Sequence, residues 1–370
     1  MRLAIDGHAD TPQRFLDLGE RFDDPASRAE VSLHRARVGG LVAQFFSIWV
    51  EPDAFPGEAA WQRAQALVES VEEQAHGSAE VALARTHDEV RSNIEQGIFS
   101  ILFGLEGAHA LGARETPISP RLDRLRMLAE RGLKYVTLTW STSNDFAGSS
   151  GDRGRDRGLS AHGLELISTC AELGVLVDVS HASDPTFNDV AKWARATSRP
   201  LVASHSSARA LASSPRNLAD DQLRALADTG GIASVNYYPS FLCDAFRARF
   251  EAEAPREWRR EIHARAKVLE TSPGRASLLA FHQVCERARA ISPMPTVETV
   301  AAHVVHMVNV AGEDHVGLGS DFDGIAAVPA GLEDASALPR LARALSQRGA
   351  APRVIDKVFA ENWLRILRAV

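Results

Sequence analysis

Eight short, apolar, β-rich runs recur along the chain, and they constrain its fold more than any other feature of the sequence. Amphipathic segments with helical periodicity lie between them, for example at residues 120–131, 161–173, 185–196 and 220–229. Several runs are apolar throughout, as is typical of parallel strands that are covered on both faces. Eight strand–helix units predict an α/β fold, a (β/α)8 TIM-type barrel. The predicted strands are residues 3–7, 41–50, 100–106, 135–140, 175–180, 201–204, 232–237 and 316–320.

The chain is longer than such a barrel needs. It has 370 residues, whereas about 250 are typical, and we expect one barrel domain over residues 1–370 with additional helical insertions near 58–93 and 241–289. The second insertion is rich in Arg, Ala and Glu, and we expect its helices over or beside the barrel mouth. The alternative is an open, doubly wound sheet. Its usual G-x-G-x-x-G turn is absent directly after the first predicted strand, so the barrel is favoured.

Composition bounds the partners and the compartment. The net charge is −7, both signs are mixed and no Lys/Arg-rich block occurs, which argues against nucleic acid or an acidic membrane surface as partner. The three cysteines are far apart and form no C-x-x-C pair, which predicts reduced thiols and a cytoplasmic location. We expect neither a leader nor a membrane span, because no basic-then-apolar start and no run of about twenty apolar residues is present.

Ionisable residues follow the predicted strands. His8 and Asp10 come two positions apart after the first strand, so their side chains point the same way. The carboxyl-terminal ends of barrel strands meet on one face, where active sites are built. Buried charges there are costly unless they are paired or bind a cation, and a mixed N/O set suits zinc or a neighbouring divalent metal. The other members of this set are Glu106, His181, His205 and Asp321.

These residues lie in motifs that occur in a recognisable order: "DGHADTP", "GLEGAHAL", "YVTLTW", "GVLVDVSH", "VASHSSARAL", "SPRNLADD" and "DHVGLGSDFDG". Together they resemble the membrane (renal) dipeptidase family of binuclear zinc peptidases, within the amidohydrolase superfamily. The similarity extends from about residue 6 to residue 367 and is weakest in the two insertions.

The resemblance implies two zinc ions per chain and small dipeptides as substrates. It implies that His8 and Asp10 bind one ion, that Glu106 bridges both, and that His181 and His205 bind the second. Asp321 would lie by the first metal and transfer protons, so Asp321 and Glu106 are the implied catalytic residues. A hydroxide shared by two zinc ions is a nucleophile at neutral pH. Members of the family often accept a C-terminal D-residue, and some open β-lactam rings.

Arg216 in "SPRN" matches the arginine that holds the carboxylate of the substrate in this family. Its planar guanidinium suits a carboxylate, although a simple ion pair with Asp220 or Asp221 is the competing interpretation. The chain departs from the animal members at Trp140, where they carry a histidine that helps bind the oxyanion. Indole has one N–H donor and no charge, so we expect Trp140 and the nearby Asn144 to contact substrate in its place.

Two alternatives remain open at this point. One is a related binuclear amidohydrolase that acts on a non-peptide amide, a lactone or a β-lactam; the other is a non-catalytic binding protein stabilised by metal. Related barrels often bridge their metals with a lysine carbamate, but Lys134 precedes its strand, whereas Glu106 fits a bridging carboxylate. The peptidase is therefore favoured. Relatives are commonly dimers, so a homodimer is expected by resemblance alone, and other divalent metals also suit the site.

Overall fold

Eight parallel strands close into a barrel, which confirms the predicted (β/α)8 fold. The computed structural model describes residues 2–152 and 156–369. The strands follow the order β2-β1-β9-β8-β7-β6-β5-β4, and β2 pairs with β4 from Ala43–Ser100 to Trp49–Glu106 to close the ring. The barrel strands are β1 (Ala4–Ala9), β2 (Leu41–Trp49), β4 (Phe99–Glu106), β5 (Leu133–Thr137), β6 (Leu176–Asp178), β7 (Leu201–Ala203), β8 (Ile232–Val235) and β9 (Val316–Leu318).

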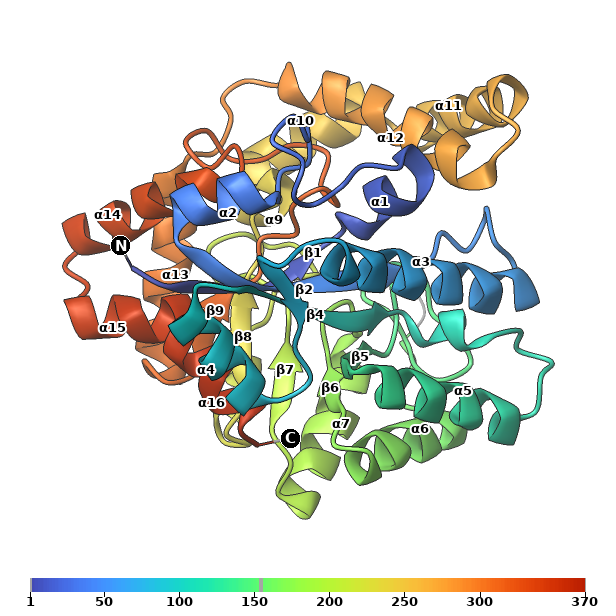
Figure 1. Ribbon diagram of the computed structural model, residues 1–370, viewed down its shortest axis with the longest axis horizontal. Coiled ribbons are helices and arrows are strands. Elements are labelled where there is room, and N and C mark those ends of the chain that lie inside the picture. Colours follow the sequence, from blue (N-terminus) through green and yellow to red (C-terminus); the bar gives the residue numbers. More distant parts are fainter. Residues whose placement is uncertain (1, 153–155, 370) are drawn as a thin grey trace.

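Helices surround this barrel (Figure 1). Those on the first half of the chain are α1 (Pro12–Leu18), α2 (Leu33–Gly39), α3 (Glu58–His76), α4 (His87–Gln96), η1 (Ala108–Leu111), α5 (Ile118–Arg131), α6 (Ala161–Glu172) and α7 (Asp184–Thr197). Those on the second half are α8 (Asp220–Ala227), α9 (Pro239–Leu242), α10 (Asp244–Glu253), α11 (Arg256–Leu269), α12 (Pro273–Arg289), α13 (Val297–Ala311), η2 (Ala335–Ala337), α14 (Leu338–Gln347), α15 (Pro352–Asp356), η3 (Lys357–Glu361) and α16 (Asn362–Leu367).

The first insertion differs from the prediction. Residues 58–93 were expected to be helical throughout, but the short strand β3 (Val81–Leu83) separates α3 from α4. β3 pairs with the first residues of β4, and β5 pairs with the same strand only from Phe103 onward. The free edge at the start of β4 therefore recruits this segment, a tertiary pairing that helical periodicity cannot reveal.

The second insertion is helical, as predicted, and comprises the end of α9 with α10, α11 and α12. α11 and α12 pack against each other, and α12 also contacts α1, so the insertion lies beside the mouth of the barrel (Figure 1). Its helices share an apolar cluster of their own, which includes Phe246, Phe250 and Ile262 and extends to Ala326 and Ala327 after β9. The insertion is thus fastened to a loop that carries predicted site residues.

Apolar side chains fill the barrel interior. Tyr135 and Phe45 lie 5.8 Å apart between ring centroids, and Trp363 of α16 packs 4.6 Å from Phe45. Gly104 makes room for this layer, because a Cβ at that position would lie 2.1 Å from the Tyr135 ring. Tyr135 is therefore held rigidly just beneath the site described below.

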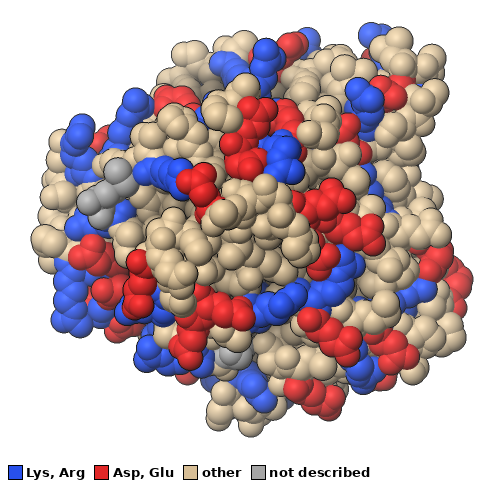
Figure 2. Space-filling model, viewed as in Figure 1, with Lys and Arg blue, Asp and Glu red and all other residues tan. Residues whose placement is uncertain are grey.

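The outer surface carries no field of a single sign on the face drawn in Figure 2, where acidic and basic residues alternate. Among the described residues, none of the helices combines the length and the apolar character that crossing a lipid bilayer requires.

Candidate metal centre

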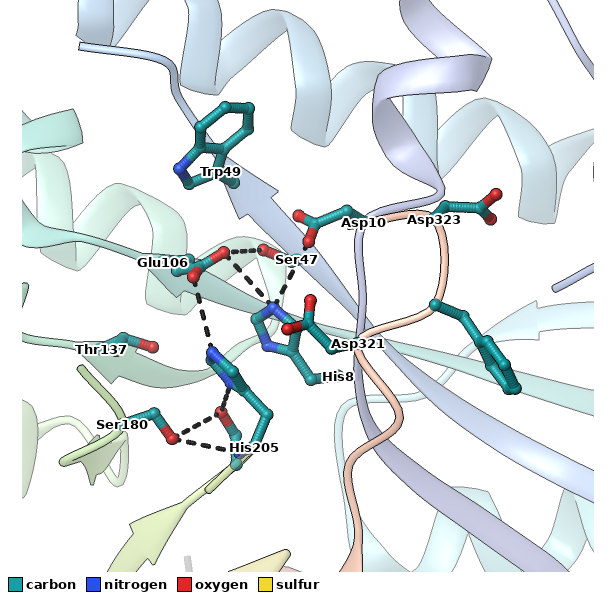
Figure 3. A network of polar contacts seen from close by, with 12 residues as sticks. His8, Asp10, Ser47, Trp49, Glu106, Thr137, Ser180, His205, Asp321 and Asp323 are labelled. Atoms are coloured by element: carbon teal, nitrogen blue, oxygen red, sulfur yellow. Dashed lines mark hydrogen bonds and ion pairs between the residues drawn. The ribbon is translucent and has the colours of Figure 1, made fainter. Parts of the chain in front are cut away.

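The barrel brings together the six ionisable residues that the sequence singled out, and all six are buried. His8 and Asp10 come from the end of β1, Glu106 ends β4, and the others follow β6, β7 and β9. Two groups of donor atoms lie within 4.8 Å of one another and could hold a cation: His8 with Glu106 and His205, and His8 with Asp10 and Asp321. Figure 3 shows five of the six, with the side chains of His8, Asp10, Glu106, His205 and Asp321 directed toward one region.

Glu106 occupies the centre of the cluster. Its Oε2 lies 3.3 Å from Nε2 of His8, and its Oε1 lies 3.0 Å from Nε2 of His181 and 3.6 Å from Nε2 of His205. Ser47 of the neighbouring strand β2 donates to Oε2 at 3.0 Å. One oxygen of the carboxylate thus faces His8 and the other faces the His181–His205 pair, as a bridging ligand requires.

The tautomer of His8 follows from its contacts. The Tyr135 hydroxyl donates its only proton to the carbonyl of Gly7 at 3.0 Å and lies 2.9 Å from Nδ1 of His8. It must therefore accept from an Nδ1–H of His8. In the neutral imidazole, the lone pair of His8 is then on Nε2, which faces Glu106 and lies 3.7 Å from the Asp10 carboxylate. This is the neutral form in which histidine binds a metal ion.

His205 is oriented by a similar relay. Ser204 donates to Oδ2 of Asp178 at 2.6 Å and lies 2.7 Å from Nδ1 of His205, so it accepts from that nitrogen. The lone pair of His205 is thus also on Nε2, 3.0 Å from Nε2 of His181. Asp178 is fully buried and also accepts the backbone N–H groups of Ser180 and Ser204 at 2.9 Å. It therefore positions the loops of both histidines.

Two site residues adopt a backbone conformation that is uncommon outside glycine. His181 and Asp321 both have φ of 65°. Such left-handed residues persist only where the surrounding structure holds them, and they concentrate at functional sites. The Asp321 backbone N–H donates to the carbonyl of His8 at 3.0 Å, and Asn236 donates to its carboxylate at 2.8 Å. These contacts aim Asp321 at the cluster.

Electrostatics within the cluster favour a bound cation. Burial raises the pKa of Asp321 to about 8, and the carboxylates of Asp10 and Glu106 add to that shift. Burial opposes ionisation of Glu106, but His8 and His181 outweigh it and hold its pKa well below the usual range. Burial likewise opposes the charge on His8, but Tyr135 and Glu106 outweigh it and raise the pKa of His8 well above its ordinary value, so a metal ion that binds to Nε2 would displace a proton. Burial, with the nearby Arg216, lowers the pKa of His181 to about 4, which keeps this imidazole neutral. Crowded carboxylates and neutral imidazoles are the donors that divalent metals bind.

Unsatisfied polar atoms show that these residues fit metal ions. Nε2 of His8 and Oδ1 of Asp10 are buried and have no hydrogen-bond partner among the described residues. Buried polar atoms are normally paired, so an orphaned pair at one point indicates a missing ligand. Gly324 keeps the adjoining space open, because a Cβ there would lie 2.0 Å from Asp10 Oδ2 and 2.6 Å from Asp321 Oδ1.

A cavity of about 320 Å³ opens above the cluster. Arg216 lies in the wall of this cavity, and its guanidinium is buried. It lies 5.2 Å from the ring centroid of Phe241 and donates to the His205 carbonyl at 3.3 Å and to the Ser206 hydroxyl at 3.4 Å. Among the described residues, Nε of Arg216 has no acceptor, and Arg216 forms no ion pair with Asp220 or Asp221. The guanidinium is available for an anionic ligand.

The two predicted substitutes for the histidine of the family differ in position. Trp140 lines the cavity together with Trp49, and their ring centroids are 5.1 Å apart. Asn144 is not among the lining residues. Its side-chain N–H donates to the Leu138 carbonyl at 2.8 Å, and its side-chain oxygen accepts the backbone N–H groups of Phe146 and Ala147. Both polar atoms of the Asn144 amide are thus engaged with the loop backbone. Asn144 therefore stabilises the loop after β5.

Asp323, which was not among the residues singled out from the sequence, connects the ligand-bearing loops. It accepts from Thr11 Oγ1 at 2.7 Å and from the backbone N–H of Glu30 at 3.0 Å, while its own N–H donates to the Glu30 carboxylate at 2.7 Å. Thr11 directly follows Asp10, and Asp323 follows Asp321 by two positions. The position of Asp323 two residues after Asp321 in "SDFDG" was the one sequence signal for this role. Its partners, Thr11 and Glu30, are distant in sequence, so the motif alone does not reveal them.

Lys134, the lysine considered for a carbamate bridge, lies within β5 rather than before it. Its side chain points away from the cluster, and its Nζ donates to the carbonyl of Arg85 at 2.6 Å. Three further side chains were not anticipated from the sequence. Tyr135 and Ser204 orient histidines, and Trp49 forms a wall of the cavity. Each belongs to an apolar run that reads as ordinary strand, so nothing in the sequence separates it from core.

Known proteins resemble this chain over nearly its whole length. The family model described as "Membrane dipeptidase (Peptidase family M19)" matches residues 2–370. An uncharacterized dipeptidase of Schizosaccharomyces pombe is 28% identical over 386 residues, which cover 98% of this chain and 79% of that protein. A metallo peptidase from Rhodobacter sphaeroides, liganded with a phosphinate mimic of the dipeptide L-Ala-D-Ala, is 27% identical with a TM-score of 0.77 and covers 100% and 99% of the two chains. The probable dipeptidase PvdM from Pseudomonas aeruginosa has a TM-score of 0.81 at 23% identity, with 100% and 95% covered, and supports the fold.

Proposed function

The chain belongs to the membrane dipeptidase family and is a metallo-dipeptidase, and on this premise we propose how its residues act on dipeptides. His8, Asp10 and Asp321 would hold one zinc ion, His181 and His205 a second, and Glu106 would bridge them. The observation that carries this assignment is the placement of Glu106, whose two oxygens face different imidazoles at 3.0–3.6 Å. When bound, two such ions supply Lewis acidity that lowers the pKa of water to about 7 and polarises a carbonyl.

The residues of the chain perform the remaining tasks. Arg216 binds the C-terminal carboxylate of the dipeptide through its planar guanidinium, which sets the length of substrate that fits. Asp321 takes a proton from the attacking water and returns it to the leaving amine, and Asn236 holds its carboxylate in place for both steps. The aromatic walls exclude bulk water, which strengthens each of these polar interactions.

The peptidase is preferred to a hydrolase of lactones or non-peptide amides for one structural reason. A dipeptide has a free carboxylate at a fixed distance from its single amide bond. Arg216 is buried and has no ion-pair partner among the described residues, so it provides the matching cation beside the metal centre. The Rhodobacter sphaeroides relative holds a mimic of L-Ala-D-Ala. This supports dipeptides as substrates of the present enzyme, including dipeptides with a C-terminal D-residue.

The test combines metal analysis with a panel of L,L and L,D dipeptides. We expect about two equivalents of zinc per chain and release of free amino acids. His205→Ala should lose zinc and turnover together, whereas the matched control His306→Ala should keep both, because His306 pairs with Asp220 outside the cavity. Zinc-loaded protein that cleaves no dipeptide would overturn the proposal, as would a His205→Ala variant with full zinc content.

A further inference from the structure

The barrel order places two chemically different groups on opposite sides of the mouth. Arg216 follows β7, and Trp49 ends β2. In the closed order β2-β1-β9-β8-β7-β6-β5-β4, these strands are four positions apart in either direction, so they lie across the barrel from each other. A dipeptide whose carboxylate is bound by Arg216 must therefore direct its N-terminal residue over the metal centre toward Trp49.

The wall at that far side is aromatic. Trp49 and Trp140 meet with 5.1 Å between ring centroids and a tilt of 54°, and both line the cavity with Glu106. Figure 3 shows Trp49 beside Glu106. Nε1 of Trp49 is buried and has no acceptor among the described residues, so one unused donor also faces this region. A tilted pair of indoles offers a large, planar, apolar surface for a third ring or an aliphatic chain.

This wall is rigid. Gln13 donates to the carbonyl of Trp49 at 2.7 Å, and Arg63 donates to Gln13 at 2.7 Å. Arg63 is itself fixed by a buried ion pair with Asp17. A contact surface held by such a chain of hydrogen bonds is organised before substrate binds, so less side-chain entropy is lost on binding.

The inserted helices complete the apolar enclosure. Leu278, Phe281 and Val284 of α12 line the cavity from above, and Ile325 after β9 adjoins them. The ionisable lining residues outside the metal centre and Arg216 are of mixed sign, so they give no net preference for a charged side chain. They are Glu51, Arg259, His263 and Asp323, together with Tyr238, whose phenol is neutral because burial raises its pKa to about 12.

We propose that this enzyme selects dipeptides with a large apolar N-terminal side chain, preferably an aromatic one, which stacks on Trp49 and Trp140. This specificity rests on the proposed function, since it assumes that Arg216 binds the C-terminal carboxylate. One additional methylene group of a substrate that fills a preformed apolar pocket raises kcat/KM by roughly 10- to 200-fold. The value of kcat/KM should therefore rise steeply from Gly to Leu and Phe at the N-terminal position.

The experiment measures kcat/KM for a series X–Ala, in which X is Gly, Ala, Leu, Phe, Glu or Lys. Wild type should favour Phe over Gly by at least about 100-fold, and Glu and Lys should be cleaved no better than Gly. Trp49→Leu and Trp140→Leu should each reduce the Phe/Gly ratio about 10-fold, mainly through KM for Phe–Ala, because each removes one ring of the wall. Trp193→Leu is the matched control, since Trp193 lies on α7 outside the cavity lining, and it should keep the wild-type ratio.

The outcomes separate this inference from the proposed function. Cleavage of every X–Ala substrate at similar efficiency, or a preference for Glu or Lys, would overturn the inference while leaving the dipeptidase assignment intact. Unchanged Phe/Gly ratios in both tryptophan variants would overturn it as well. Failure to cleave any substrate in the series, with zinc bound, would instead overturn the proposed function.

Discussion

The hydroxyl of Tyr135 lies 2.9 Å from Nδ1 of His8, and because it donates to Gly7 it can only accept from that nitrogen. A side chain in the barrel interior thus determines which nitrogen of His8 faces the metal centre. Outer contacts of this kind commonly change metal affinity 10- to 100-fold when they are removed.

Tyr135→Phe tests this relationship. The variant frees His8 to move its proton to Nε2, so we expect zinc to bind about 10- to 100-fold more weakly, as measured by competition with a chelator. Tyr237→Phe is the matched control, because the buried Tyr237 hydroxyl has no hydrogen-bond partner among the described residues. Its removal should leave zinc affinity unchanged. Equal zinc affinity in wild type and Tyr135→Phe would show that the tautomer of His8 does not depend on this contact.

Arg216→Met tests the carboxylate clamp. Hydrogen bonds to charged groups contribute about 1.5–3 kcal/mol, so KM for a dipeptide with a free carboxylate should rise roughly 10- to 100-fold. The same dipeptide with a C-terminal amide should show a much smaller change. A parallel rise in KM for both substrates would indicate a general disturbance of the cavity and would remove Arg216 from the clamp.

Asp323→Asn tests the connection between the two ligand-bearing loops. Asparagine replaces one acceptor oxygen by a donor, so it cannot accept from both Thr11 and the backbone N–H of Glu30. We expect about 10- to 100-fold weaker zinc binding and a free energy of unfolding lower by about 1–3 kcal/mol in chelator-treated protein. Asp314→Asn is the control, because Asp314 lies before β9 rather than after it and pairs with Lys357. This variant should bind zinc normally. Unchanged zinc affinity in Asp323→Asn would refute the positioning role.

His303 predicts a pH dependence of stability. It lies buried on α13, accepts from the backbone N–H of Ala208 at 3.1 Å and contacts the Leu242 carbonyl at 3.2 Å, and burial lowers its pKa to about 4. The unfolded chain binds this proton at pH values below about 6.5 and the folded protein only below about 4, so stability falls as the pH drops through that window. The full effect is about 3 kcal/mol.

Urea unfolding of wild type and His303→Gln between pH 7.5 and pH 4 provides the measurement. The variant should be less stable at pH 7.5 but should lose less stability on acidification, so that the two curves converge. Curves that remain parallel across the window would show that His303 is not the source of the pH dependence.

The periodicity of the sequence was sufficient for the architecture. Eight apolar runs followed by amphipathic segments determine a barrel, because parallel strands covered on both faces must be apolar throughout. The same pattern missed β3, since three residues of strand depend on a free edge of β4 that lies elsewhere in the chain. The six ionisable residues could also be found from the sequence. A charged residue at the end of an apolar strand is costly to bury unless it is paired or binds a cation, so its presence there indicates a site.

Only the tertiary structure decided which ordinary residues serve the site. Tyr135, Ser204 and Asp178 read as strand residues, and their role arises from hydrogen bonds. Tyr135 of β5 contacts His8 at the end of β1, and Ser204 bonds both Asp178 of β6 and the adjacent His205. Asp323 reads as a turn, yet its partners are about 300 positions away. The sequence by itself determined the barrel and its converging donors, because both follow from local patterns of polarity. Orientation, tautomer and the aromatic wall depend on contacts between distant segments, and local patterns contain no information about those distances.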